Sequence, residues 1–339
     1  MGNEQNQGNH ISKTLDYLLK YDSINTIDVF QIALNIGKPF ISIEKQVIFD
    51  PDSEDKVVVT FPSNSIKDEI IINAISKFTI NDKDFVINYI KHNFTHHLKD
   101  KKKSNLGKYY TSGHLVQLVI DLVKPYLKEK SIVLDLAAGC GAFIGHFDGF
   151  MTIGRDIDKD AVKILCALGF KNVDHDNSLL NVKRSKYGLC DEDHVIVVGN
   201  PPYNDVTSKN KKHGAISKEK IDVSIDRDIS SNDYGICFLK AFNKLKVDVI
   251  CVLHPLSYLI KETNFNRLGV FTSNYHLKKA VIFSSREFLD TQKTPFPIIA
   301  ALYLRGKGMS YEYIKNFQFD EYLNQYKYEL IFLNLIRIE

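Results

Sequence analysis

The chain has 339 residues, of which 44% are hydrophobic, and a formal net charge of +3 at neutral pH. Its length exceeds one typical domain, so we expect a large domain with an appendage, and no apolar run approaches the roughly 20 residues that a membrane span requires. The five cysteines lie far apart without a Cys-x-x-Cys pair, and no secretory signal follows Met1, which together favour reduced thiols in the cytoplasm and argue against a zinc site.

Residues 1–105 are predicted to form a mostly helical extension that contains some β-structure. Leucines at helical spacing predict a helix over residues 12–22, and two further helices are predicted within residues 64–98. The apolar segments 47–49 and 57–61 flank a polar turn, a pattern typical of a β-hairpin. This part of the chain carries no motif that indicates a reaction.

Residues 106–305 are predicted to form an α/β domain, because buried strands alternate with helical stretches. Strands are expected near residues 132–136, 151–155, 171–174, 195–198, 248–253, 279–283 and 297–304. This alternation indicates a mainly parallel sheet with helices on both faces and a ligand site at the carboxyl ends of the strands. Asp135, Asp156, Asp176 and Asn200 all fall at or just after such strand ends.

A turn of small residues follows the first of these strands. In the segment 137–141, Ala-Ala-Gly-Cys-Gly, Gly139 and Gly141 allow a ligand to approach the backbone, and a helix is predicted to begin here with free N–H groups. Asp156, at the end of the next strand, is placed to accept both ribose hydroxyls of a nucleoside cofactor. A dinucleotide cofactor is the weaker interpretation, because its fingerprint requires Gly or Ala at the position of Ile144.

The most informative motif is Asn200-Pro201-Pro202-Tyr203, which ends the apolar run 195–198. The two prolines terminate the strand and stiffen the turn. The Asn200 amide and the Pro201 carbonyl are then free to accept hydrogen bonds from an NH2 group, and Tyr203 offers a flat face to a planar ring. Such a clamp suits methylation of a base amino group. A strand-ending turn with a buried tyrosine is the purely structural alternative.

The order of these motifs resembles that of the N6-adenine DNA methyltransferases of restriction–modification systems, in their gamma arrangement, which use S-adenosylmethionine (SAM). The segment 107–113, with Tyr110 and Thr111, is similar to the first motif of that family, whose threonine contacts the methionine part of the cofactor. Ser112 stands where the family usually has proline. Asp176 resembles the acidic residue of the third cofactor motif, which would hold the adenine amine of SAM.

The resemblance covers roughly residues 105–305 and implies a set of binding residues around one base and one cofactor. The target base would leave the duplex and stack on Tyr203, with Phe288 or Phe296 closing its other face. No metal is required. The residues expected to contact the cofactor are Tyr110, Thr111, Asp135, Ala137, Gly139, Gly141, Asp156, Ile157, Asp176 and Asn177.

A basic loop beyond the clamp predicts contact with DNA. Lys209, Lys211 and Lys212 are expected to hold backbone phosphates, although a solvated loop accounts for them equally well. Residues 306–339 are too few for an independent recognition domain. We therefore expect either that the chain is truncated or that a specificity subunit or restriction endonuclease is its partner; recognition by residues 1–105 is the third option. Neither a membrane nor a metal partner is expected.

These patterns predict a site-specific DNA methyltransferase that transfers a methyl group from SAM to N6 of a flipped adenine. One alternative is a protein methyltransferase acting on a glutamine side-chain amide, because that family also uses Asn-Pro-Pro-Tyr and the amide is also a planar NH2 group. The other alternative is a non-catalytic DNA-specificity or interaction subunit. The intact Asp135, Asp156 and Asn200 argue against a decayed site.

Overall fold

The computed structural model describes residues 40–43, 46–49, 57–60, 111, 113–167, 169–203, 224–287 and 295–322. Several predictions fall outside these residues. They are the helices over 12–22 and 64–98, the cofactor residue Tyr110, the aromatic residue Phe288 and the basic residues Lys209, Lys211 and Lys212.

Three short strands form a small antiparallel sheet in the N-terminal part of the chain. They are β1 (Phe40–Ile43), β2 (Gln46–Phe49) and β3 (Val57–Thr60), and β2 lies in the centre. Phe49 lies opposite Val57, so β2 and β3 form the predicted hairpin around the polar turn. The sequence did not predict β1, because its four residues are too few to show a clear alternation.

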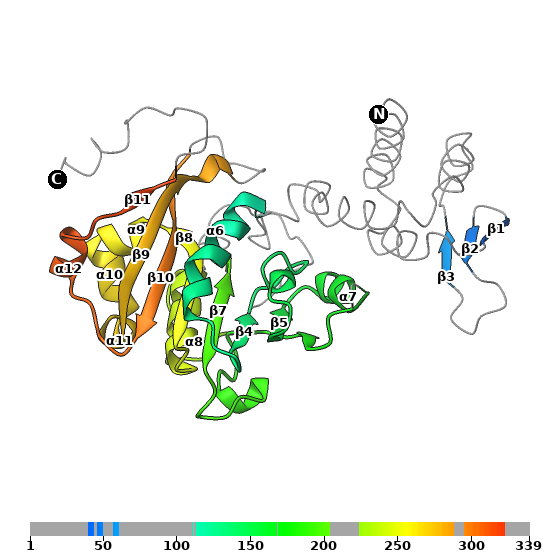
Figure 1. The fold of residues 1–339 in the computed structure, drawn as a ribbon, viewed down its shortest axis with the longest axis horizontal. Helices are drawn as coiled ribbons and strands as arrows, with labels where there is room; N and C mark the ends of the chain where they lie inside the picture. Colours follow the sequence, from blue (N-terminus) through cyan, green and yellow to red (C-terminus); the bar gives the residue numbers. More distant parts are fainter. Residues whose placement is uncertain are drawn as a thin grey trace, which may run out of the picture.

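The second sheet has eight strands in the order β11-β9-β10-β8-β7-β4-β5-β6 (Figure 1). The strands are β4 (Ile132–Asp135), β5 (Met151–Asp156), β6 (Val173–His175), β7 (Val195–Gly199), β8 (Val249–Pro255), β9 (Tyr275–Ser284), β10 (Pro297–Arg305) and β11 (Asp320–Glu321). Strands β4 to β8 are mutually parallel, whereas β10 is antiparallel to both β8 and β9. All seven predicted strands are present, and the predicted mainly parallel sheet is confirmed.

Helices cover both faces of this sheet, which explains why its central strands are apolar at almost every position. Every residue of β4 and β7 is buried. Helix α6 (Gly113–Val123) packs against β8 and β10 on one face, while α8, α9, α10 and α11 lie on the other (Figure 1). The remaining bounds are α7 (Lys159–Ala167), α8 (Tyr234–Lys244), α9 (Ser257–Ile260), α10 (Glu262–Leu268), α11 (Val270–Asn274) and α12 (Tyr311–Lys315). Within the described part of the chain, none of the helices has the length and apolar character needed to cross a bilayer.

The order of the strands creates a switch point between β4 and β7. The chain adds β5 and β6 outward on one side of β4 and then returns to place β7 on its other side. In open α/β sheets, ligands bind where the segments leaving two such neighbouring strands diverge. The turn after β4 and the Asn-Pro-Pro-Tyr motif after β7 leave from these two strands.

The prediction that a helix begins directly after β4 is wrong. The described segment 139–150 forms turns with one short 3₁₀ segment, η4 (Ile144–His146), and no α-helix. Gly139, Gly141 and Gly149 have φ values of 52°, 83° and 83°, which an α-helix does not allow. Glycine is also about 1 kcal/mol less favourable than alanine inside a helix. The N–H groups near the ligand site therefore come from turns.

Candidate functional site

Asp156, at the end of β5, holds the turn that follows β4. Its Oδ2 accepts a hydrogen bond from the Gly139 N–H at 2.8 Å, and its Oδ1 accepts one from the Asp158 N–H at 2.8 Å. These bonds fix the carboxylate at the strand end, in the position predicted for a ribose acceptor. A Cβ atom placed on Gly139 would meet nothing within 4 Å, so the space beside this part of the turn is open.

Asp135, at the end of β4, is a buried carboxyl group with one oxygen left over. Its Oδ1 accepts a hydrogen bond from the Ala137 N–H at 3.1 Å, whereas its Oδ2 has no hydrogen-bond partner among the described residues. Burial raises the pKa of Asp135 to about 8, and the nearby charge of Asp156 adds to this effect against the opposing Ala137 N–H. A buried carboxyl oxygen without a partner is a group that a ligand can satisfy.

Gly199, the last residue of β7, connects Asp135 to the predicted clamp. Its φ is 149°, and a Cβ atom at this position would lie 2.8 Å from Asp135 Oδ1. Only glycine allows the carboxyl group to approach the strand this closely. Sequence reasoning did not select Gly199, although a glycine that closes a β-branched strand directly before Asn200 was a usable signal.

Asp176 follows β6 and forms an ion pair with Lys186 at 2.8 Å. Lys186 Nζ also donates to the carbonyl oxygens of Asn177 at 2.9 Å and Leu180 at 2.7 Å. The lysine therefore ties Asp176 to the loop behind it. Sequence reasoning missed Lys186, because a lysine among other basic residues gives no sign of the tertiary contact it makes.

The side chain of Asn177 forms hydrogen bonds with two backbone groups. Its Oδ1 accepts from the Leu179 N–H at 3.1 Å, and its Nδ2 donates to the Ser224 carbonyl at 2.7 Å. Asp226 reinforces this link, since its N–H donates to the Leu179 carbonyl at 2.9 Å. Residues 224–226 are thereby joined to the loop that carries Asp176. The Asn177 side chain stabilises the conformation of this loop.

The Asn200 side chain has a defined orientation. Its Nδ2 donates to Thr111 Oγ1 at 3.2 Å, and its Oδ1 is buried without a hydrogen-bond partner among the described residues. Because Thr111 engages the amide N–H, the oxygen is the atom presented to a ligand. The structure thus brings a predicted cofactor residue and a predicted catalytic residue into direct contact.

The backbone after Asn200 offers acceptors and lacks donors. Neither Pro201 nor Pro202 has an N–H group, and Pro201 is buried. An amino group with two N–H bonds can be satisfied by Asn200 Oδ1 and a neighbouring carbonyl. A ring carbonyl would instead face further acceptors, so the motif discriminates between these two chemical groups.

Tyr203 packs against Phe296, which directly precedes β10. The two ring centroids lie 6.4 Å apart, the ring planes meet at 80°, and Tyr203 is 7% exposed. Ser285 fixes the backbone of Phe296, because its Oγ accepts from the Phe296 N–H at 3.0 Å and its N–H donates to the Phe296 carbonyl at 2.9 Å. Phe296, one of the two aromatic residues predicted to close the site, therefore lies beside Tyr203, whereas Phe288 lies outside the described residues.

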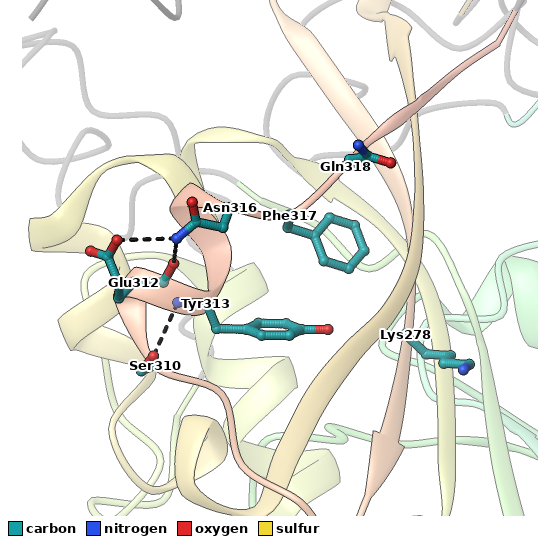
Figure 2. A pocket seen from close by; sticks show the side chains of 7 residues that line it. All are labelled: Lys278, Ser310, Glu312, Tyr313, Asn316, Phe317 and Gln318. Atoms are coloured by element: carbon teal, nitrogen blue, oxygen red, sulfur yellow. Dashed lines mark hydrogen bonds between the residues drawn. The ribbon is translucent and has the colours of Figure 1, made fainter.

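A groove of about 710 Å³ lies elsewhere, between α12 and β9 (Figure 2). Its lining residues are Lys278, Ser310, Glu312, Tyr313, Asn316, Phe317 and Gln318. Several of its polar groups bond to the protein itself: Tyr313 donates to the Leu277 carbonyl at 2.8 Å, and Asn316 Nδ2 donates to the Glu312 carbonyl at 2.9 Å. None of the predicted site residues lines this groove, so we place the candidate site at β4 and β7.

The site residues are not arranged as a metal centre. Among the residues that the structure describes, no group of three or more His, Cys, Asp or Glu side chains is positioned to hold a metal ion. The acidic residues instead stand singly at successive strand ends, at Asp135, Asp156 and Asp176. This spacing suits a ligand that extends along the edge of the sheet.

Comparison with known proteins agrees with this placement. Residues 86–239 match a family model described as N-6 DNA methylase. This match confirms the resemblance inferred from the motif order, and it includes the turn after β4 and the clamp after β7. No curated protein sequence matches the chain.

Two solved structures are similar to the chain at low sequence identity. A protein described as a class I SAM-dependent methyltransferase from Listeria monocytogenes superposes with a TM-score of 0.52 at 11% identity, over 89% of this chain and 88% of that one. A protein described as a modification subunit of a type I restriction enzyme from Vibrio vulnificus has a TM-score of 0.49 at 13% identity, over 70% of this chain and 53% of that one. The chain therefore spans about half the length of the Vibrio protein.

Proposed function

From the match of residues 86–239 to the N-6 DNA methylase family model, we propose that the chain transfers a methyl group from SAM to N6 of an adenine in DNA. One observation carries the proposal. Asn200 presents a buried oxygen with no partner among the described residues, at the switch point of the sheet and directly before two prolines. This acceptor suits an exocyclic amine.

The residues present fit SAM. In this proposal Asp156, at the end of β5, accepts the ribose hydroxyls, and Asp176, directly after β6, accepts the adenine amine. Asp135 Oδ2 is buried without a hydrogen-bond partner among the described residues, so it can also accept from a ligand. The open space beside Gly139 leaves room for a ligand to meet the turn. When bound, the cofactor supplies a methyl group activated by its positively charged sulfur. The chain's own residues then have to position the amine and make its nitrogen more nucleophilic.

Asn200 and Pro201 prepare the amine in this proposal. Adenine N6 is a poor nucleophile because its lone pair is delocalised into the ring. Asn200 Oδ1 and the Pro201 carbonyl accept hydrogen bonds from its two N–H groups, which favours a pyramidal nitrogen with a localised lone pair. Because Thr111 already orients the amide, the acceptor needs no rearrangement when the base arrives.

Tyr203 holds the ring of the base. Its aromatic face supplies stacking, which is worth about 1–3 kcal/mol per base in single-strand binding. Since Tyr203 is 7% exposed and Phe296 meets its ring, the base enters by displacing side chains that cover the tyrosine. Phe296 is then placed to close the other side of the base.

Parallel labelling of three substrates tests the proposal. The purified chain is incubated with methyl-labelled SAM and unmethylated DNA, RNA or a glutamine-containing peptide. We expect label in DNA, recovered as N6-methyladenine after digestion to nucleosides. Label confined to RNA or to the peptide would contradict the proposed substrate.

A glutamine side-chain amide is the second candidate substrate, and the site chemistry alone favours it equally. The clamp at Asn200 and Pro201 accepts any planar NH2 group. The family match of residues 86–239 favours DNA. The peptide arm of the labelling experiment separates the two.

We further infer that the chain consists of three regions and that a partner subunit selects its target sequence. Residues 106–305 form the catalytic domain, residues 1–105 are an extension, and residues 306–339 are a tail. The loop with Lys209, Lys211 and Lys212 contacts DNA phosphates, and a specificity subunit selects the target sequence. Co-purification with a specificity subunit from the same restriction–modification system, followed by DNA binding, tests this inference.

A further inference from the structure

A buried aromatic stack behind the clamp takes no part in the chemistry above. His254, at the end of β8, stacks on Tyr258 of α9 with ring centroids 5.2 Å apart and planes at 12°. Its ring also stacks with Tyr303 of β10 at 5.9 Å and 14°. All three side chains are buried. A column of this kind fixes the position of each ring in it.

His254 is locked as a neutral member of this column. Its Nε2 accepts from the Tyr303 hydroxyl at 2.8 Å, and its Nδ1 donates to the Pro255 carbonyl at 3.0 Å. Burial lowers the pKa of His254 to about 4, so the ring stays uncharged at neutral pH. With both nitrogens engaged, His254 serves as a rigid support for Tyr258.

The other end of Tyr258 is held by Asp233. The Tyr258 hydroxyl donates to Asp233 Oδ1, and the same oxygen accepts from the N–H groups of Gly235 at 2.8 Å and Ile236 at 3.3 Å. Asp233 is the N-cap residue of α8. The hydroxyl of Tyr258 is therefore fixed at the first turn of this helix.

Gly235 is the position where the stack meets the clamp. A Cβ atom at Gly235 would lie 2.5 Å from the Tyr258 hydroxyl oxygen and 3.2 Å from Tyr203 Cβ. Both tyrosines thus pack closely against the same backbone atoms. A displacement of the Tyr258 hydroxyl would therefore shift Tyr203 Cβ, because close-packed groups transmit small shifts.

We propose that Tyr258 is a positioning residue for the clamp: its hydroxyl, held by Asp233, forms with Gly235 the floor on which Tyr203 rests. This inference rests on the proposed function and extends it to a residue outside the Asn-Pro-Pro-Tyr motif. Tyr258 keeps the Tyr203 ring in the place that stacking of the base requires. Small misplacements of such a group can lower reaction rates by roughly a hundredfold.

Tyr258→Phe tests the proposal, with Tyr275→Phe as its matched control. Tyr275 is also fully buried and donates its hydroxyl hydrogen to the Val247 carbonyl at 2.6 Å. It is the first residue of β9, however, and lies level with the start of β8, away from the carboxyl ends of β4 and β7. Both variants lose one buried hydroxyl bond, so we expect similar decreases in melting temperature. Only Tyr258→Phe should lower kcat/KM for DNA, by roughly 10- to 100-fold, while SAM affinity stays unchanged.

A double-mutant cycle with Tyr203→Ala gives a second readout. Once the Tyr203 ring is gone, Tyr258→Phe should cause little further loss of kcat/KM, because both act through the same ring. Full additivity in the cycle, or equal kcat/KM for Tyr258→Phe and Tyr275→Phe, would overturn the inference. If the wild-type protein labels the peptide and not DNA, the proposed function fails, and the same comparison made on the peptide still decides the role of Tyr258.

Discussion

Thr111 and Asn200 lie 89 positions apart in the chain, yet their side chains meet at 3.2 Å. An amide group has a donor end and an acceptor end, and either end can face a ligand. The Thr111 hydroxyl engages the donor end, which leaves Asn200 Oδ1 for the substrate. The polarity of the clamp is therefore set by a residue outside the Asn-Pro-Pro-Tyr motif.

Replacing this hydroxyl should weaken the clamp. We expect Thr111→Val to lower the rate of methyl transfer at saturating SAM by roughly tenfold or more, since a lost orienting hydrogen bond is worth about 1–3 kcal/mol. Valine matches threonine in shape but cannot accept the amide N–H. Thr111→Ser keeps the hydroxyl and should retain most of the rate. Equal rates for the two variants in a radiolabel assay would show that the hydroxyl does not orient Asn200.

Asp135 should make the stability of the ligand-free protein depend on pH. Its pKa is about 8 in the folded chain, above the value of about 4 for a solvated aspartate. Between these values the folded state binds more protons than the unfolded state, so the free energy of unfolding falls as pH rises from about 4 to about 8. Urea unfolding at several pH values measures this slope. Asp135→Asn should make it shallower, and parallel curves for the two proteins would contradict the assignment.

At the scale of secondary structure, the strands could be predicted from sequence and the segments between them less well. The buried runs 132–134 of β4 and 195–198 of β7 consist of apolar residues alone, and this pattern predicts a buried strand without further information. The turn after β4 was expected to lead into a helix, but the positive φ values of Gly139 and Gly141 exclude one. The sequence showed which residues were small and did not show which backbone conformation they adopt.

The same limit applies to the site. Asn200, Asp156 and Asp135 were predicted because each stands at a strand end, a position that the sequence reveals. Lys186 and Tyr258 were not predicted, because their roles arise from contacts with residues that the sequence does not place beside them. Motifs in the sequence thus predict side chains that could bind a ligand, whereas the side chains that hold them in place can be identified only from the packed structure.

The loop after β4 depends on Asp156, which joins it to the end of β5. Asp156→Ala removes the acceptors for the N–H groups of Gly139 and Asp158, together with the expected ribose contact. Hydrogen bonds to a charged group contribute about 1.5–3 kcal/mol each, so SAM affinity should fall by roughly tenfold or more. Calorimetric titration with SAM measures this, and an unchanged dissociation constant would refute the ribose assignment.

At the scale of the whole molecule, one flipped base cannot define a DNA sequence. Specific recognition needs side chains at several base edges and an interface of about 1,000–2,500 Å² of protein surface. The proposed clamp of Asn200 and Pro201 holds a single base, so we infer that a partner supplies sequence recognition.

The chain alone should accordingly bind DNA without sequence preference. Lys209, Lys211 and Lys212 should give binding that weakens steeply with salt, because phosphate contacts release counterions. Selection from a library of random duplexes, followed by sequencing of the retained DNA, measures the preference. Enrichment of one adenine-containing motif by the isolated chain would assign recognition to the chain itself, with residues 1–105 as the first region to examine.

The central claim is that Asn200 acts on the amine and not on the cofactor. The measurement that tests it most directly compares wild-type protein with Asn200→Ala in two assays: N6-methyladenine formed in DNA, quantified by mass spectrometry of the nucleosides, and SAM affinity by calorimetry. We predict that the variant binds SAM nearly as tightly as the wild type but forms methyladenine more slowly by roughly two to three orders of magnitude. Near-normal methylation by a folded Asn200→Ala protein would contradict the account.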